Sequence, residues 1–192
     1  MPRTREQFSD MKDERRASIL HAALPLFALN KKVSIDAICE RAKCSHGIIY
    51  HYYVNVDAIR DALFRSPTYV ELKDRLFNND EGSSYEKIEH IISVLLDVNA
   101  KNIDNVCYFN MFIKDKEKGS IYAKLCKLVK DGQTAGSIVG GEAIQLVDSV
   151  FLLLKGLYLT FLLEKHPDIK VPSVETVMQL LRKPSNFNRQ SF

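Results

Sequence analysis

Apolar residues recur at helical spacing along most of the chain, and the alternation typical of β-strands is scarce. The pattern predicts a helix over about residues 11–29, followed by short helices that begin after Ser34, Ser45 and Asn55, since such side chains cap the first turn of a helix. Pro67 is expected to end the fourth helix, with a turn at Ser66-Pro67. The predicted fold class is all-α.

The second half of the chain continues in the same way. Residues 78–84 (NNDEGSS) form the clearest predicted loop, and helices are expected from about 85, over 106–114 and through 121–129. The segment 142–164 is apolar almost all round, which is typical of a helix buried on several sides. Ser173 is expected to cap a last helix that reaches about Lys183.

The sequence predicts two domains, 1–55 and 56–192, and the surplus of positive charge lies toward the N-terminus. The formal net charge is +3, and residues 1–66 carry eleven Lys and Arg against eight Asp and Glu, whereas the remainder is balanced. A surplus of this size is a hint that the N-terminal domain faces a polyanion, and it excludes a strongly basic protein that coats nucleic acid.

The cysteine spacing, the N-terminal residues and the apolar segment 142–164 indicate the cellular compartment in which the protein is expected. No CxxC pair occurs among the four cysteines, which are Cys39, Cys44, Cys107 and Cys126. The sequence therefore shows neither the spacing of a zinc site nor a disulfide framework. Met1 to Lys12 is polar and lacks the apolar core of a signal peptide, and Asp148 and Lys155 interrupt the apolar segment 142–164. We therefore expect a cytoplasmic protein that does not span a membrane.

Residues 34–53 (SIDAICERAKCSHGIIYHYY) read as two short helices joined by a tight turn, which is helix-turn-helix geometry. Ile49 and Tyr53 are four residues apart and are expected to face inward. His46 is then free to reach a base edge and Ile48 a thymine methyl, while Gly47 lets the backbone approach DNA closely. The tyrosine and histidine side chains of this helix suit phosphate oxygens.

This region resembles the DNA-binding domain of TetR-family transcriptional regulators. The resemblance covers about residues 15–64 and rests on Ile19, Ala22-Ala23 and Leu26-Phe27, then Ser34-Ile35, Ile38 and Ala42, then Ser45, Gly47, Ile49-Tyr50, His51 and Tyr52-Tyr53, and last Asn55, Asp57 and Ile59. It implies an N-terminal three-helix DNA-binding domain and a C-terminal helical domain for ligand binding and dimerisation. The candidate DNA-binding residues are Ser34, Lys43, Ser45, His46, Gly47, Ile48, Tyr50, His51 and Tyr52.

Three departures from the family pattern bear on DNA affinity. The segment Asn30-Lys31-Lys32 lacks the usual glycine between the first two helices. Lys43 stands where the turn usually has glycine, so a non-glycine residue is expected in a left-handed conformation. Val56 stands where the next helix usually begins with a lysine that contacts phosphate. The departure at Val56 supports an alternative class of protein, a helical dimeric interaction module with a vestigial helix-turn-helix.

The resemblance also implies a ligand cavity in the C-terminal domain. Most of the bulky apolar residues there must fill the core. The absence of a charge cluster in the sequence favours a small hydrophobic or amphipathic effector, expected to lower DNA affinity through the helix that starts at Asn55. The candidate pocket residues are Tyr108, Phe109, Met111, Phe112, Tyr122, Phe151 and Tyr158.

The surplus of apolar surface near the C-terminus predicts a symmetric homodimer, formed by the segments 142–164 and 173–183. The candidate interface residues are Leu153, Gly156, Leu157, Val177 and Leu181. Such a dimer is expected to bind an inverted repeat in double-stranded DNA, as a repressor. No nucleophile elbow, carboxylate pair or phosphate-cradling loop appears, and His46 and His51 are five apart, so we expect no enzyme, cofactor or metal site.

Overall fold

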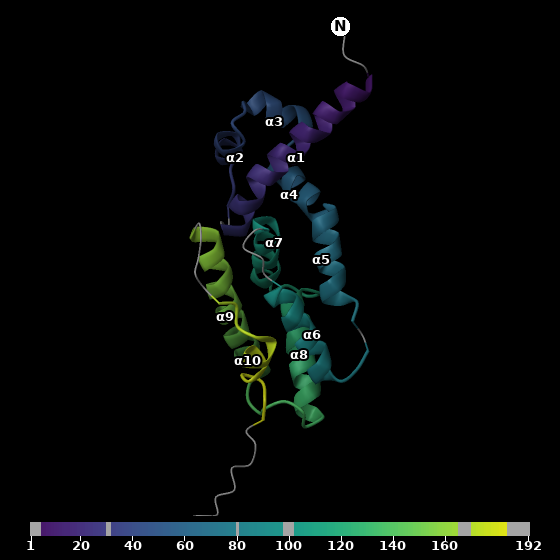
Figure 1. Cartoon of the computed structure of the whole chain (residues 1–192), viewed down its shortest axis with the longest axis vertical. Helices are drawn as coiled ribbons and strands as arrows, with labels where there is room; N and C mark the ends of the chain where they lie inside the picture. The colour runs from purple at the N-terminus through teal and green to yellow at the C-terminus, as the bar shows by residue number, and fades with distance from the viewer. Residues whose placement is uncertain (1–4, 30–31, 80, 98–101, 165–169, 184–192) are drawn as a thin grey trace, which may run out of the picture.

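The computed structural model describes residues 5–29, 32–79, 81–97, 102–164 and 170–183, and within these ranges the regular structure is entirely α-helical. Helices α1–α3 lie at one end of an elongated molecule, and α6 and α8–α10 lie toward the other (Figure 1). The all-α prediction is confirmed. The helices are α1 (Arg5–Leu29), α2 (Ile35–Ala42), α3 (His46–Tyr52), α4 (Val56–Phe64), α5 (Pro67–Phe77), α6 (Ser84–Leu96), α7 (Ile103–Lys114), α8 (Ile121–Thr134), α9 (Ala143–Leu163) and α10 (Val174–Met178).

Local capping sets the boundaries of the short N-terminal helices. The Ser34 hydroxyl accepts a bond from the Ala37 N–H at 3.2 Å, and the Asn55 side chain accepts one from the Ala58 N–H at 2.8 Å, as predicted. Ser45 occupies the N-cap position of α3 without a side-chain capping bond. A small core then holds the three helices and the start of α4 together, with these buried residues: Ile19, Ala23, Ile38, Cys39, Ile49, Tyr53 and Ile59.

Helix α1 connects the two parts of the molecule. Ile19 and Ala23 belong to the small N-terminal core, whereas Leu24 and Ala28 belong to the larger core of the C-terminal body. The same helix packs against α7 as well as against α2 and α4. The first helix is therefore shared between the predicted domains 1–55 and 56–192.

The end of α1 is held by α7. Pro25 lies inside α1 and removes one backbone donor from its last turns. The carbonyl of Ala28 accepts a bond from Asn110 Nδ2 at 2.9 Å and one from Lys114 Nζ at 2.8 Å, and Lys114 also donates to the Phe27 carbonyl at 3.3 Å. These bonds satisfy carbonyl groups that the end of a helix leaves without intrahelical partners.

Helix α5 is absent from the sequence-based expectation, which placed only a turn at Ser66-Pro67. The turn exists, but Ser66 also caps a new helix by accepting a bond from the Tyr69 N–H at 3.3 Å. Pro67 stands in the first turn of that helix, where a missing N–H costs nothing. The proline therefore separates α4 from α5 instead of ending the helical region.

The body consists of α6–α9 with α10 against α6. Ser83 and Glu86 form a reciprocal capping box at the start of α6. Helix α9 is long and apolar enough to pass a length-and-composition test for a membrane span, but its inner face is buried against α7 and α8. The inner face of α9 comprises Ala143, Val147, Val150, Phe151, Leu154, Leu157, Tyr158 and Phe161.

The last helix is shorter than predicted. It ends at Met178, although the expectation extended it to Lys183. Beyond that point Leu180 and Leu181 donate to carbonyls three residues back, so the chain tightens into a turn. The carbonyl of Leu181 then accepts a bond from the Val139 N–H at 2.9 Å, which ties this turn to the segment between α8 and α9.

Candidate DNA-binding surface and ligand cavities

The turn between α2 and α3 has the backbone that a helix-turn-helix requires. Lys43 adopts φ 50° and ψ 50°, so the predicted left-handed conformation is confirmed. The Lys43 N–H donates to the Glu40 carbonyl at 3.3 Å, and the Cys44 N–H donates to the Cys39 carbonyl at 3.1 Å. These two bonds close the end of α2 and direct the chain into α3.

Helix α3 buries one side and exposes the other. Ile49 is fully buried and Tyr53 nearly so, which confirms the predicted inward pair. Tyr50 on the opposite side is 54% exposed. Ile48 and Tyr52 are half-buried and pack in part against the small N-terminal core, so only part of each side chain is accessible. The other candidate DNA-binding residues are all exposed: Ser34, Lys43, Ser45, His46, Gly47 and His51.

A hydrogen bond that the sequence did not reveal lies on this surface. His46 Nε2 is 2.6 Å from Asp36 Oδ1, and both side chains are largely exposed. Because a carboxylate only accepts, Nε2 is the donor in this bond. The other ring nitrogen, Nδ1, is then an acceptor when the ring is neutral and a donor only when it is protonated. Asp36 therefore restricts what His46 can offer to a base.

A groove of about 600 Å³ lies where the N-terminal half of α1 passes α3. Helix α1 begins at Arg5, about two turns earlier than predicted, and this extra length runs past α3 (Figure 1). The groove places two basic residues of α1, Lys12 and Arg15, beside two candidate phosphate-contacting residues of α3, His51 and Tyr52. Its walls are Met11, Lys12, Glu14, Arg15, Ser18, His51 and Tyr52.

The start of α4 lacks a basic side chain aimed at phosphate. Val56 is half-buried in the first turn of this helix. Arg60, one turn further on, pairs with Asp57 at 3.0 Å. The phosphate contact expected of the family at this position is therefore not supplied by Val56.

The aromatic residues predicted to line a ligand pocket are packed against one another or against other core residues. Phe109 stacks with Tyr158 at 6.0 Å between ring centroids, and Tyr122 meets Phe151 edge-on at 5.4 Å. Phe112 stacks with Tyr69 at 4.8 Å. One of the seven candidates, Phe151, also lines a cavity between α7 and α9.

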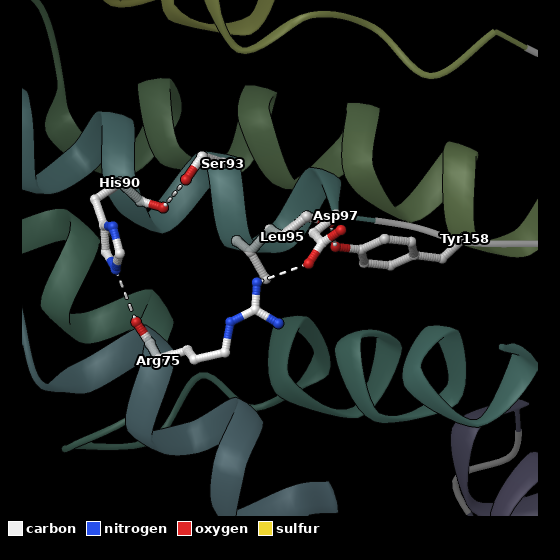
Figure 2. A network of polar contacts seen from close by, with 6 residues as sticks. All are labelled: Arg75, His90, Ser93, Leu95, Asp97 and Tyr158. Atoms are coloured by element: carbon white, nitrogen blue, oxygen red, sulfur yellow. Dashed lines mark hydrogen bonds and ion pairs between the residues drawn. The ribbon is translucent and has the colours of Figure 1, made fainter.

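Polar contacts keep these aromatic groups in place. The Tyr158 hydroxyl donates to the Leu95 carbonyl at 2.6 Å, and full burial raises the pKa of Tyr158 well above its ordinary value. Figure 2 shows this bond beside the ion pair between Arg75 and Asp97, in which the two atoms are 2.7 Å apart. The Tyr108 hydroxyl is likewise bonded to Ser66 at 2.8 Å. The rings are therefore anchored core residues.

A cavity of about 500 Å³ lies between the end of α7 and one flank of α9. Ile113, Phe151 and Leu152 provide apolar wall, and the rest of the lining is charged. Lys116 Nζ and Asp148 Oδ1 pair across it at 2.6 Å. The full lining is Ile113, Lys114, Lys116, Asp148, Phe151, Leu152 and Lys155.

The structure divides the predicted dimer-interface residues between the core and the surface. Leu157, Val177 and Leu181 are buried within the protomer, so their side chains are not on an exposed face. Leu153 is half-buried and Gly156 is exposed. Two leucines that the sequence analysis did not select, Leu152 and Leu163, are each 70% exposed. They lie on the same side of α9 as Gly156, at intervals of four and seven residues.

No protein-family model matches the sequence, and no curated protein matches it. Solved structures do match. A regulatory protein of the TetR family from Rhodococcus has 12% identity and a TM-score of 0.54, over 89% of this chain and 98% of that one. A protein described as a fatty acid metabolism regulator from Clostridium perfringens has 17% identity and a TM-score of 0.55, over 85% and 96%.

A third similar structure is described as a transcriptional regulator from Saccharomonospora viridis in complex with choline. It has 18% identity and a TM-score of 0.50, over 90% of this chain and 100% of that one. At these identities the similarity concerns the fold, and it covers the N-terminal helices and the body together. The arrangement of α1–α3 on a helical body is thus the all-helical fold of the TetR-family transcriptional regulators.

Proposed function

We propose that the protein is a DNA-binding transcriptional regulator that acts as a homodimer on an inverted repeat, as a repressor released by a small effector. The observation that carries the proposal is the helix-turn-helix of α2 and α3, with Ile49 buried and Tyr50 exposed on opposite sides of α3. One side of α3 fixes it to the domain, and the other is available to enter a major groove. It is proposed as a cytoplasmic binding protein with no catalytic activity of its own.

The surface around α3 supports distinct roles for its residues. We propose that His46 and Ile48 read base edges and that Tyr50, His51 and Tyr52 contact phosphate, with Ser34, Lys43 and Ser45 beside them and Gly47 permitting close approach. Lys12 and Arg15 from α1 lie beside His51 and Tyr52 and add positive charge there. They are proposed to supply phosphate contact in place of the lysine missing at Val56.

The test is selection of a binding site from random duplexes with the full-length protein, followed by anisotropy titrations across a range of salt concentrations. The expected product is an inverted repeat whose half-sites are about 34–36 Å apart or a multiple of that distance. Affinity should fall steeply as salt rises, because phosphate contacts release counterions. Failure to enrich any sequence, together with no salt-dependent binding, would contradict the proposal.

Two variants separate base reading from phosphate contact on the selected site. His46→Ala should lose discrimination against single base changes by about 1–3 kcal/mol, the range for a good base contact. Tyr50→Phe should weaken binding to all sequences alike. Identical profiles for the two variants across a panel of altered sites would refute this division.

A second candidate function is a helical dimeric interaction module in which the helix-turn-helix no longer binds DNA. Val56 favours it, because the usual phosphate contact at the start of α4 is missing and the nearby Arg60 is paired with Asp57. This candidate predicts no salt-dependent DNA binding, so the titrations above decide between the two.

A further inference from the structure

The cavity between α7 and α9 has the chemistry of a site for an amphipathic anion. We infer that it binds a small carboxylate with a hydrocarbon chain, and that Lys114 transmits its binding to the DNA-binding domain. The effector expected from the sequence was hydrophobic or amphipathic and lay among the core aromatics, so this inference adds a negative charge to the ligand and moves its site. It rests on the proposed function only for the consequence for DNA.

The shape of the cavity suits such a ligand. Its volume of about 500 Å³ lies within the range of small-molecule sites, roughly 300–1,000 Å³. Asp148, Phe151, Leu152 and Lys155 are spaced by three, four and seven residues, so one flank of α9 forms a continuous wall. Ile113 on α7 completes an apolar surface that could cover a short alkyl chain.

The charges in the cavity favour an anionic head group. Three lysines and a single aspartate line it. Asp148 is engaged by Lys116 at 2.6 Å, and Lys116 also lies 4.5 Å from the centre of the Tyr122 ring. Lys155 forms no ion pair with any residue in the described part of the chain. The positive charge of Lys155 is therefore not neutralised locally, and a carboxylate placed there would gain a partner.

Lys114 connects this cavity to α1. Its side chain is half-buried and lines the cavity, while its ammonium donates to the carbonyls of Phe27 and Ala28 at the end of α1. An anion in the cavity would attract the same ammonium and so weaken its bonds to those carbonyls. Because α1 also forms part of the small core that holds α3, a change at its end would alter the position of α3 relative to the body. Binding of the anion is therefore expected to lower DNA affinity.

The core aromatics do not offer an equivalent site. Phe109, Tyr158 and Phe112 already have stacking partners, and the hydroxyl of Tyr158 is satisfied by the Leu95 carbonyl. A ligand placed among them would have to separate these rings. The α7–α9 cavity needs no such rearrangement.

The experiment uses decanoate as the anionic probe and decan-1-ol as its neutral counterpart with the same chain length, titrated into the full-length protein by calorimetry below their aggregation limits. Decanoate should bind at least about tenfold more tightly than decan-1-ol. Lys155→Gln should weaken decanoate about threefold to fivefold, the effect of losing one partly exposed charge pair, whereas Lys155→Arg should retain affinity. Lys118→Gln, which removes a lysine that lies between α7 and α8 and does not line the cavity, should have no effect.

Coupling is tested on the selected DNA duplex. Decanoate should reduce the affinity of the wild-type protein for DNA, and DNA should reduce the affinity for decanoate by the same factor, because linkage is reciprocal. Lys114→Met keeps an unbranched side chain of similar length and removes its charge, and in this variant decanoate should no longer change DNA affinity. Retained coupling in Lys114→Met would overturn the proposed route.

Failure of this inference is distinguishable from failure of the proposed function. Equal affinity for decanoate and decan-1-ol, no binding of either, or decanoate binding unaffected by Lys155→Gln would overturn the anion site, even if the protein binds DNA as proposed. Absence of DNA binding would contradict the proposed function and with it the coupling, while the calorimetric comparison would still decide the ligand site.

Discussion

Asp36 places a carboxylate on the surface proposed to face DNA and holds the ring of His46. We expect Asp36→Asn to raise affinity for all duplexes, because it removes repulsion between a carboxylate and phosphate. The gain should shrink as salt screens the charge. The measurement is DNA affinity by anisotropy at low and high salt.

Glu40→Gln is the matched control for this change, because it removes an exposed carboxylate from the same helix without touching His46. It should raise affinity less than Asp36→Asn does. Equal effects of the two substitutions would mean that the pairing with His46 has no consequence for binding.

Lys43 carries a cost in the turn between α2 and α3, because left-handed backbone disfavours a residue with a Cβ atom. Lys43→Gly should raise the free energy of unfolding by up to about 1 kcal/mol, since relief of this strain exceeds the added flexibility of the unfolded chain. Urea unfolding measures the change. Lys43→Ala removes the same charge but keeps the Cβ, so a gain of equal size in that variant would contradict the explanation.

The residues that could be predicted from sequence are those whose partners are close in the chain. Ser34 and Asn55 cap helices through bonds to N–H groups three residues away, and both were expected. Asp36 and His46 are ten residues apart on two helices, and their contact depends on the angle between those helices. No spacing rule for a single helix reveals a pair of that kind.

Among the helices, the start of α6 has a pH-dependent cap. Bonds from the Ser83 backbone N–H and hydroxyl to the Glu86 carboxylate lower the pKa of Glu86. A lowered pKa in the folded state stabilises the protein above the unfolded-state value of about 4.3, and this contribution disappears as pH falls through the folded-state value. The urea midpoint of Glu86→Gln should therefore fall less than that of the wild type between about pH 7 and pH 3.

Glu89→Gln serves as the comparison for Glu86→Gln, because it removes an exposed carboxylate one turn further along α6. The midpoint of Glu89→Gln should follow the wild type across the same pH range. A fall in Glu86→Gln as large as that of the wild type would show that the cap does not contribute to acid sensitivity.

Helix α9 offers a direct test of dimerisation. A Cβ built at Gly156 meets no atom within 4 Å, so the protomer itself tolerates a larger residue there. Gly156→Arg should give a monomer in sedimentation equilibrium if Gly156 and Leu163 form the contact with a second copy. Gly156→Ala should remain dimeric and should be more stable by about 1 kcal/mol, the difference in helix propensity.

A dimer that persists in Gly156→Arg would place the interface elsewhere on the protomer. Leu157→Glu should behave differently from both substitutions at Gly156, because Leu157 is buried in the protomer and a charge there should unfold it. The three variants together separate loss of assembly from loss of fold.

Helices α5 and α10 differ from the sequence-based expectation for physical reasons. Helix α5 was missed because Pro67 reads as a breaker, although proline is well suited to the first turn of a helix. Helix α10 was extended too far because Leu180 and Leu181 continue its apolar pattern. A bond from Val139, more than forty residues earlier, stabilises the turn that replaces its end.

The two cores of the protein share α1, and this has a consequence for unfolding. We expect a single transition in scanning calorimetry, because α1 contributes side chains to both cores. Replacing both Asn110 and Lys114 with methionine removes the bonds that hold the end of α1 to α7. That double variant should show a second, lower transition for the N-terminal helices, and a single unbroadened transition would contradict the role given to these bonds.

Of the two candidate sites, only the DNA-binding surface could be predicted from sequence, because its residues lie in one continuous segment. Residues 34–53 suffice to place α2, its turn and α3. The cavity between α7 and α9 combines Lys114 and Lys116 with Asp148 and Lys155, more than thirty residues later, so the charges appear scattered in the sequence. The aromatic residues are conspicuous in sequence, but their mutual packing is visible only in three dimensions.

The shared position of α1 also limits how the protein can be recombined with others. A cut at residue 55, where the sequence places the domain boundary, would take Leu24 and Ala28 away from the body core and leave the Asn110 side chain without its carbonyl partner. A chimera that exchanged DNA specificity between such regulators would therefore have to transplant the outer turns of α1 with α2 and α3, and retain the inner turns with α7. The natural junction for a graft lies inside α1, between Ala23 and Leu24, and not at residue 55.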